Sequence, residues 1–341
     1  MRAAYFEAHG GREVLKVGEL PTPEPGPGEV RVRTVAFALN HLDVWVRRGW
    51  KGLELTLPHI GGSDGAGVVD AVGPGVSAWK PGDEVVLSAG CFCTRCRACL
   101  EGKENLCESF HLFGEHRNGT GAEYFVVPER NLLKKPEGLS WEEAAAIGVT
   151  FLTAWHMLVT RARLRLDETV LVQGASAGVG VAAIQIAKLH GARVIALTSS
   201  EEKAARARDL GADEVVNYRT EDAKARLRSL APKGVDIVFE HVGEATWELS
   251  VKALRKGGRL VTCGATTGPH GHTDLRLLFT KQIDILGSTM GTRAELDRVL
   301  YWAGHKRIVP IVDRVLPIDE IAEGHRLLEE AEHFGKIVVR P

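Results

Sequence analysis

Thr169–Thr198 reads TVLVQGASAGVGVAAIQIAKLHGARVIALT, and this stretch decides the fold. The apolar run Val170–Gln173 precedes a glycine-rich turn, Gly174–Gly180, which is followed by the helical segment Val181–His190 and a second apolar run, Arg193–Thr198. Two strands joined through a helix are expected to be parallel, because a parallel pair needs a long crossover connection. The stretch therefore predicts one strand–helix–strand unit.

The same alternation continues after this unit. A predicted helix, Glu201–Leu210, ends at Gly211, and further apolar runs follow at Glu214–Asn217, Val235–Glu240, Arg259–Cys263 and Ile283–Gly287. Strands that alternate with helices predict a doubly wound parallel sheet with helices on both faces, the α/β Rossmann class.

The first 130 residues have a different character. Short apolar runs such as Val30–Val35 and Gly65–Val72 are separated by glycine and proline turns, which predicts a mostly β domain. Ser140-Trp-Glu-Glu143 matches a capping box and opens a helix that leads out of this domain. The tail contains a helix after Gly291, an apolar run at Ile308–Val315, a helix near Asp319–Ala331 and a strand at Lys336–Arg340, and we expect it to pack on the first domain. The expected domains are 1–150 with 288–341, and 151–287.

Charge and hydropathy narrow the range of functions that the sequence allows. The 341 residues include 43 Lys and Arg against 44 Asp and Glu, a formal net charge of −1, so no basic face for a nucleic acid is predicted. No uncharged apolar run approaches the roughly 20 residues that cross a bilayer, and the first residues do not resemble a signal peptide. These features predict a cytoplasmic protein that acts on a small molecule.

The glycine-rich turn is a candidate dinucleotide site. Gly174, Gly178 and Gly180 permit a tight turn and let a pyrophosphate approach the amides at the start of the helix. We expect the nicotinamide near Thr150 and Gly264, in a cleft between the domains. The predicted contacts of the turn and its neighbourhood are Thr150, Gly174, Ala175, Ser176, Gly178, Val179, Gly180, Val242 and Gly264.

The residues at the end of the second predicted strand indicate whether NAD or NADP is the coenzyme. A carboxylate about 20 residues beyond the glycine turn would favour NAD. This chain has Thr198, Ser199 and Ser200 there, with Lys203 after them and Tyr218 and Arg219 after the third strand, a set that could hold the extra phosphate of NADPH. NADPH is the preferred coenzyme and NADH remains possible. In the alternative interpretation, Ser199 and Ser200 cap the next helix and Lys203 is a solvated helix residue.

Five of the six cysteines lie between Cys91 and Cys107, which indicates a metal site rather than disulfides. Four of them have the spacing Cys93-x2-Cys96-x2-Cys99-x7-Cys107, and four thiolates can enclose Zn²⁺ tetrahedrally. With the runs Gly82–Val85, Gly121–Tyr124, Gly178–Gly180 and Gly257-Gly258, the chain resembles the medium-chain dehydrogenase/reductase superfamily along essentially its whole length. The resemblance implies a GroES-like catalytic domain with a structural-zinc lobe at 91–107 and a Rossmann domain.

The resemblance also implies that the catalytic zinc of the alcohol-dehydrogenase branch is missing. The positions that correspond to its ligands are Asn40, Ser63 and Val149, none of which offers a thiolate or imidazole. Asn40-x2-Asp43-x3-Arg47-x-Gly49 instead resembles the zinc-independent quinone-oxidoreductase branch. The implied catalytic residues are Asn40 and His41, which would bind the substrate oxygen and supply a proton.

Less specific interpretations remain open for these residues. Asn40 could hold a turn, Asp43 and Arg47 could form a structural ion pair, and a second zinc could bind among His41, His59, Asp43 and Asp64. The leading function is hydride transfer between NADPH and a quinone, enone or aldehyde. The alternatives are a zinc-dependent alcohol dehydrogenase with altered ligands and a non-catalytic nucleotide-binding protein. The edge strand Gln282–Gly287 lies where this family commonly pairs sheets between subunits, so a homodimer or homotetramer is expected.

Overall fold

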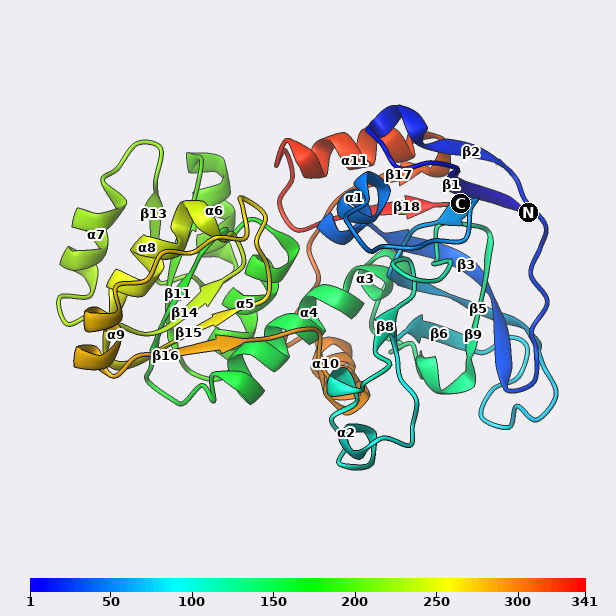
Figure 1. Ribbon diagram of the computed structural model, residues 1–341, viewed down its shortest axis with the longest axis horizontal. Helices are drawn as coiled ribbons and strands as arrows, with labels where there is room; N and C mark the ends of the chain where they lie inside the picture. Colours follow the sequence, from blue (N-terminus) through cyan, green and yellow to red (C-terminus); the bar gives the residue numbers. More distant parts are fainter. The chain divides into compact units, whose positions relative to one another are not determined.

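The computed structural model describes residues 1–341, and the chain forms two units (Figure 1). The discontinuous unit consists of Met1–Leu152 and Gly291–Pro341, and the continuous unit consists of Thr153–Met290. None of the helices combines the length and the apolar character that crossing a bilayer requires.

The continuous unit is built on one six-stranded sheet in which every pairing is parallel. Its strand order is β13-β12-β11-β14-β15-β16, with β11 at Thr169–Val172, β12 at Arg193–Thr198, β13 at Glu214–Asn217, β14 at Val235–Glu240, β15 at Leu254–Thr262 and β16 at Asp284–Gly287. The connecting helices are α5 (Gly178–Leu189), α6 (Glu201–Asp209), α7 (Ala223–Leu230), α8 (Glu244–Ala253) and α9 (Leu275–Lys281). The predicted doubly wound α/β sheet is confirmed.

Two boundaries differ from the prediction in this unit. The crossover helix begins at Gly178 rather than Val181, so two of the loop glycines belong to its first turn. Strand β15 begins at Leu254, five residues before the predicted run, because Leu254 pairs with Val235 ahead of a register shift in the ladder. Side chains of α7, α8 and α9 pack with the strands in one apolar cluster that includes Leu171, Leu227 and Val251.

The discontinuous unit is mostly β, as predicted. Its main sheet has the order β10-β6-β5-β3-β18-β17, with β9 paired to β3, and smaller sheets join β2-β1-β4 and β7-β8. The strands are β1 (Arg2–Phe6), β2 (Lys16–Glu19), β3 (Glu29–Ala38), β4 (His59–Ile60), β5 (Asp64–Val72), β6 (Glu84–Leu87), β7 (Gly90–Cys91), β8 (His111–Leu112), β9 (Tyr124–Pro128), β10 (Leu132–Lys134), β17 (Val312–Pro317) and β18 (Lys336–Arg340). The helices are α1 (His41–Arg48), α2 (Arg97–Leu100), α3 (Trp141–Ala146), α10 (Arg293–Gly304) and α11 (Ile321–Glu329), with α4 (Gly148–Trp155) leading into the continuous unit.

The chain's last residues return to the first sheet. Strand β18 pairs antiparallel with β3, Val338 opposite Ala38, and parallel with β17, which confirms the expected packing of the tail. The predicted run Ile308–Val315 is displaced, because the strand there is Val312–Pro317. The Ser140 capping box is confirmed, since its Oγ accepts from the Glu143 amide at 3.1 Å and Glu143 Oε2 accepts from the Ser140 amide at 2.8 Å.

Candidate functional site

The glycine turn of the continuous unit is the predicted pyrophosphate site, and its backbone is tightly packed. Gly174 has a φ of +55°, and a side chain on Gly180 would come within 2.5 Å of the Gly174 carbonyl oxygen. The turn therefore needs glycine at both positions. It delivers the chain into α5, whose first amides have no intrahelical partner and carry the positive end of the helix dipole. Of the predicted contacts, Ala175, Ser176 and Val179 lie in this turn or in the first turn of α5.

The carboxyl ends of β14 and β15 border the same turn. The site that a side chain on Gly174 would occupy lies 2.8 Å from the His241 ring and 3.2 Å from Val242. A side chain on Gly264 would meet the His241 carbonyl oxygen at 2.8 Å. The structure thus brings Val242 and Gly264 to the edge of the sheet that carries Gly174. The predicted contact Thr150 belongs to the discontinuous unit, where its hydroxyl donates to the Ala146 carbonyl oxygen at 3.2 Å.

Sequence reasoning missed Glu240 and His241, which hold this edge in shape. Glu240 is fully buried, and its carboxylate accepts from the amides of Val242 and Gly243 at 2.7 and 3.1 Å and from Ser250 Oγ at 2.6 Å. The His241 ring is hydrogen-bonded to the Gln173 carbonyl oxygen at 2.9 Å, and burial lowers the pKa of this imidazole. The one signal in the sequence was a carboxylate at the end of an otherwise apolar strand.

The residues proposed to select the coenzyme gather where β12 and β13 end. Thr198 lies opposite Asn217, and the Tyr218 amide donates to the Thr198 carbonyl oxygen at 3.1 Å, so the two strand ends are adjacent. Ser200 Oγ accepts from the Lys203 amide at 3.2 Å, which confirms the alternative role of Ser200 as a helix cap. Ser199 and Lys203 are half-buried.

Two acidic side chains near these strand ends are bound to Asn217. Glu201 Oε1 accepts from the Asn217 side-chain amide at 2.8 Å, and Glu221 Oε1 accepts from its backbone amide at 2.9 Å. Neither carboxylate occupies the residue position, at the end of β12, where a ribose-binding acid is expected.

The cysteine lobe fits a tetrahedral metal. The Sγ atoms of Cys93, Cys96, Cys99 and Cys107 all lie within 4.8 Å of one another, with 3.5 Å between those of Cys96 and Cys99. Four sulfurs about 2.3 Å from a zinc ion are separated by similar distances. Amides of Arg95 and Cys96 lower the pKa of Cys93 to about 6, which favours the thiolate. The spare Cys91 is buried, and burial raises its pKa to about 11.

No other group of three or more His, Cys, Asp or Glu side chains lies within such distances in residues 1–341. His41, His59, Asp43 and Asp64, which were considered for a second zinc, do not form one. His59 is instead hydrogen-bonded to the Gly114 carbonyl oxygen at 3.2 Å, and burial lowers the pKa of its ring.

Asn40, one of the three positions that the resemblance assigns to catalytic-zinc ligands, lies beside a buried ion pair. Lys336 Nζ donates to Asn40 Oδ1 at 2.6 Å and to Asp64 Oδ2 at 3.0 Å, and Asn40 Nδ2 donates to the same Asp64 oxygen at 2.9 Å. Asp64 is fully buried and Lys336 is 3% exposed. The other Asp64 oxygen accepts from the Val149 amide at 2.7 Å. Ser63 Oγ donates away from this cluster, to the Phe113 carbonyl oxygen.

His41 is the first residue of α1, next to Asn40 in the chain. Its side chain is half-buried, and its ring centroid lies 5.2 Å from that of Trp45 in an edge-on arrangement. The structure therefore places the two predicted catalytic residues at the amino end of one helix.

The expected ion pair between Asp43 and Arg47 is wrong. Asp43 accepts from the Asn40 and Gly62 amides at 2.7 and 2.9 Å, and burial, opposed by these two bonds, raises its pKa to about 6. Arg47 faces α11, where it donates to Glu329 at 2.5 Å and its Nη1 lies 3.2 Å from His325 Nδ1. Asp43 at the first turn of α1 is directed back to the backbone, so the two side chains do not meet.

His325 gives a pH-dependent prediction. Burial and the neighbouring Arg47 lower its pKa to about 3, while an unfolded histidine titrates near 6.5. Between these pH values the histidine is protonated in the unfolded chain but not in the folded one. The free energy of unfolding is therefore not reduced by this group above about pH 6.5, and it falls as the pH drops towards 3. At pH 5, His325 should lower the free energy of unfolding by roughly 2 kcal/mol relative to pH 7.5. We expect His325→Gln to remove that loss in urea unfolding at the two pH values.

The matched control for this measurement is His305→Gln, at an exposed histidine, which should keep the wild-type difference between pH 7.5 and pH 5. Contributions from other groups, including Asp43, are common to the variants and cancel in the comparison. An identical loss of stability in wild type and His325→Gln would contradict the assignment.

Comparison with known proteins shows resemblance over most of the chain. The zinc-binding dehydrogenase family matches residues 178–304, and the alcohol dehydrogenase GroES-like domain matches residues 26–137. A crystal structure of an NAD-dependent alcohol dehydrogenase is 53% identical, with a TM-score of 0.97 over 100% of both chains. Crotonyl-CoA reductase of Streptomyces avermitilis is 33% identical over 96% of this chain and 82% of its own length. Quinone oxidoreductase of Pseudomonas aeruginosa is 35% identical, with 98% and 95% covered. The three names denote oxidoreductases and differ in substrate.

Proposed function

Because the chain belongs to the medium-chain dehydrogenase/reductase superfamily and is an NAD(P)-dependent dehydrogenase or reductase, we propose that it transfers hydride from NADPH to a quinone, enone or aldehyde without a catalytic zinc. Bound NADPH would supply the hydride. The proposal includes one structural zinc in the cysteine lobe.

The buried Lys336–Asp64–Asn40 cluster is the observation that carries this proposal. A catalytic zinc needs about three thiolate, imidazole or carboxylate ligands with an open fourth position. Asn40 offers an amide whose oxygen already accepts from Lys336, and Asp64 offers a carboxylate that is paired with the same ammonium group. A second cation next to Lys336 would be repelled in a site with a low dielectric constant. The cluster is therefore poorly suited to a metal.

Substrates with conjugated acceptors fit such a site. Hydride addition to a quinone or enone leaves negative charge that is delocalised onto a conjugated oxygen, so the transition state needs less electrophilic help than alcohol oxidation does. Asn40 Nδ2 uses one of its two hydrogens on Asp64, and the other can donate to a substrate oxygen. Lys336 and Asp64 fix the orientation of that amide. We assign proton donation to His41, and solvent is the alternative donor if His41→Ala keeps full turnover.

Zinc content and turnover test the proposal together. We expect one zinc per chain by elemental analysis, and oxidation of NADPH with members of quinone, enone and aldehyde panels. We expect His41→Ala and Asn40→Ala each to lower kcat/KM by about tenfold or more, as is typical when a positioned acid–base group or hydrogen-bond donor is lost. If both variants kept turnover within a few-fold of wild type on good substrates, the assigned roles would be wrong.

A zinc-dependent alcohol dehydrogenase with altered ligands is the second candidate. It is favoured by the name of the 53% identical structure, an NAD-dependent alcohol dehydrogenase. Two zinc ions per chain, with alcohol oxidation that a chelator abolishes while the fold persists, would establish this candidate and exclude the first.

Coenzyme choice gives a separate prediction. Ser199 lies at the end of β12, where a carboxylate would repel the extra phosphate of NADPH and bind the ribose of NADH. We expect Ser199→Asp to raise the KM for NADPH at least tenfold and to leave the KM for NADH within threefold of wild type. Ser199→Asn, which has the same shape without the charge, is the control and should keep the preference for NADPH. Equal effects of Ser199→Asp on both coenzymes would place the phosphate elsewhere.

A further inference from the structure

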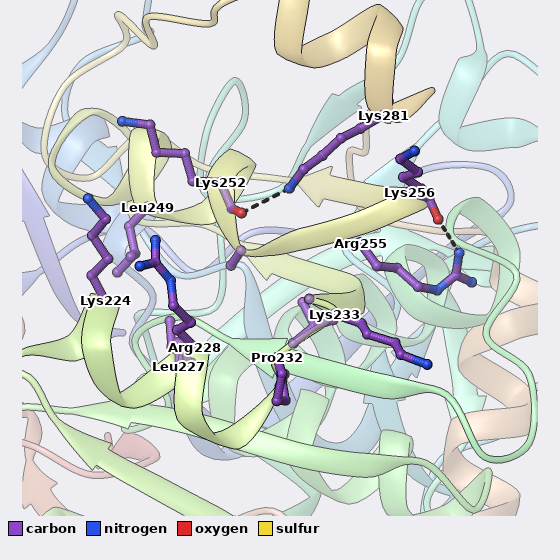
Figure 2. Close-up of a pocket in the computed structure, with 14 residues that line it drawn as sticks. Lys224, Leu227, Arg228, Pro232, Lys233, Leu249, Lys252, Arg255, Lys256 and Lys281 are labelled. Carbon is purple, nitrogen blue, oxygen red and sulfur yellow. Dashed lines mark hydrogen bonds between the residues drawn. The ribbon is translucent and has the colours of Figure 1, made fainter.

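A basic hollow of about 810 Å³ lies in the continuous unit, away from the glycine turn (Figure 2). Its walls come from the ends of α7, α8 and α9, from the turn that precedes β14 and from the first residues of β15. Gly174, Val242 and Gly264 follow the carboxyl ends of parallel strands, whereas Gly234 and Ala253 precede the amino ends of β14 and β15. The hollow is therefore on the opposite edge of the sheet from the predicted coenzyme site.

The lining contains seven cationic side chains and no carboxylate. The cations are Lys224, Arg228, Lys233, Lys252, Arg255, Lys256 and Lys281. In the view of Figure 2, the charged ends of Lys224, Arg228 and Lys252 lie on one side of the hollow, and those of Lys233, Arg255 and Lys256 lie on the other. A ligand in the hollow would therefore be flanked by positive charge on two sides.

Helix ends account for only three of these cations. Arg228, Lys252 and Lys281 are in the last turns of their helices, where basic side chains complement the negative end of the helix dipole. Lys224 is in the first turn of α7, the end at which a cation is unfavourable. Lys233 lies in the turn before β14.

Local ion pairs leave several of the charges uncompensated. Lys252 pairs with Glu248, and Arg255 pairs with Asp236 at 2.5 Å. Lys233 and Lys256 make no hydrogen bond or ion pair through their side chains, and Lys224 has only a longer-range attraction to Glu248, the partner of Lys252. Exposed cations that gather without acidic partners raise the local positive potential and attract anions.

The walls of the hollow are held in place before any ligand binds. Gly234 has a φ of +89°, and a side chain there would come within 2.5 Å of the Arg255 amide, so the turn before β14 packs directly on the start of β15. Lys281 Nζ donates to the carbonyl oxygens of Leu254 and Lys252 at 2.6 and 3.2 Å, which ties α9 to the end of α8. Leu227 and Leu249 add apolar surface between the cations.

We propose that the basic hollow binds a small organic polyphosphate, a molecule with two or more phosphate groups on an apolar or planar body. Its volume is that of a small-molecule site, its cations can hold several phosphate oxygens, and its apolar walls can cover the rest of the ligand. A concave site surrounded by cations favours a small ligand over a nucleic acid, which would need an extended basic surface.

The test uses the full-length protein with one equivalent of NADPH per chain, which fills the coenzyme site and leaves the hollow free for a nucleotide probe. Binding of ATP and of inorganic tripolyphosphate is measured by titration calorimetry in 0.1 M salt. We expect ATP to bind, and to bind more tightly than tripolyphosphate because its base contacts the apolar walls. The double variant Lys233→Gln/Lys256→Gln should weaken ATP binding at least tenfold.

The control is the double variant Lys51→Gln/Lys80→Gln, which removes the same charge from exposed positions in the discontinuous unit. Thermal melting of both variants should match wild type, because all four lysines are exposed. Three outcomes would overturn the proposal: no ATP binding to the protein with one equivalent of NADPH per chain, equal weakening in the two double variants, or tripolyphosphate binding as tightly as ATP.

Discussion

Replacing Lys336 by methionine is expected to lower the free energy of unfolding by about 3–5 kcal/mol. The change leaves the fully buried Asp64 carboxylate with two neutral donors, Asn40 Nδ2 and the Val149 amide, and no opposite charge. A buried charge that loses its partner retains its full cost of desolvation, and methionine fills most of the volume of the lysine stem, so the loss is electrostatic rather than a cavity effect. Urea unfolding at pH 7.5 measures it.

A double variant separates charge from packing. Lys336→Met/Asp64→Asn removes both charges, and its amide can still donate and accept near Asn40. We expect it to recover more than half of the stability that Lys336→Met loses, because the buried group is then neutral. If the double variant were as unstable as the sum of the single variants Lys336→Met and Asp64→Asn, the two side chains would not be coupled and the ion pair would be of no consequence.

The Lys336 cluster also shows where sequence reasoning ends. The glycine turn was predictable because its features lie within a dozen residues, from Val170 to Gly180, and each one has a local physical cause. Lys336 and Asn40 are 296 residues apart, and only the antiparallel pairing of β18 with β3 brings them together. A lysine at the start of the apolar strand Lys336–Arg340 was a visible signal, but nothing in the sequence specifies its partner.

The error at Asp43 and Arg47 has a related cause. Residues four apart on a helix face the same side, so the spacing favoured an ion pair. Asp43 is in the first turn of α1, where backbone amides compete for its carboxylate, and Arg47 is near the last turn, where α11 presents Glu329. Local spacing predicted the helix correctly, but tertiary contacts decided the partners.

Loss of any one lobe cysteine is expected to release the structural zinc. Cys99→Ser should reduce the zinc content from one ion per chain to near zero, because a hydroxyl is a poor substitute for a thiolate and the remaining three sulfurs leave an open position. The lobe has little structure of its own between β7 and β8, only the four-residue helix α2 and a single turn at Glu104–Leu106. Zinc binding to such a segment is also folding free energy.

The stability of the whole protein should fall with the zinc. Structural zinc sites contribute on the order of 10 kcal/mol to the segments that they fold, of which we expect at least roughly 3 kcal/mol to appear as global stability. For a protein of this size, that loss would lower the melting temperature by roughly 4 °C or more. Differential scanning calorimetry with zinc analysis of the same samples measures both quantities.

Cys91→Ala and Cys263→Ala are the controls and should retain one zinc, since neither thiol belongs to the cluster. NADPH binding should survive in Cys99→Ser, because the glycine turn lies in the continuous unit and its shape depends on Gly174, Gly180 and His241 rather than on the lobe. Retention of zinc by Cys99→Ser, or an unchanged melting temperature without zinc, would show that these four thiols do not hold a structural metal.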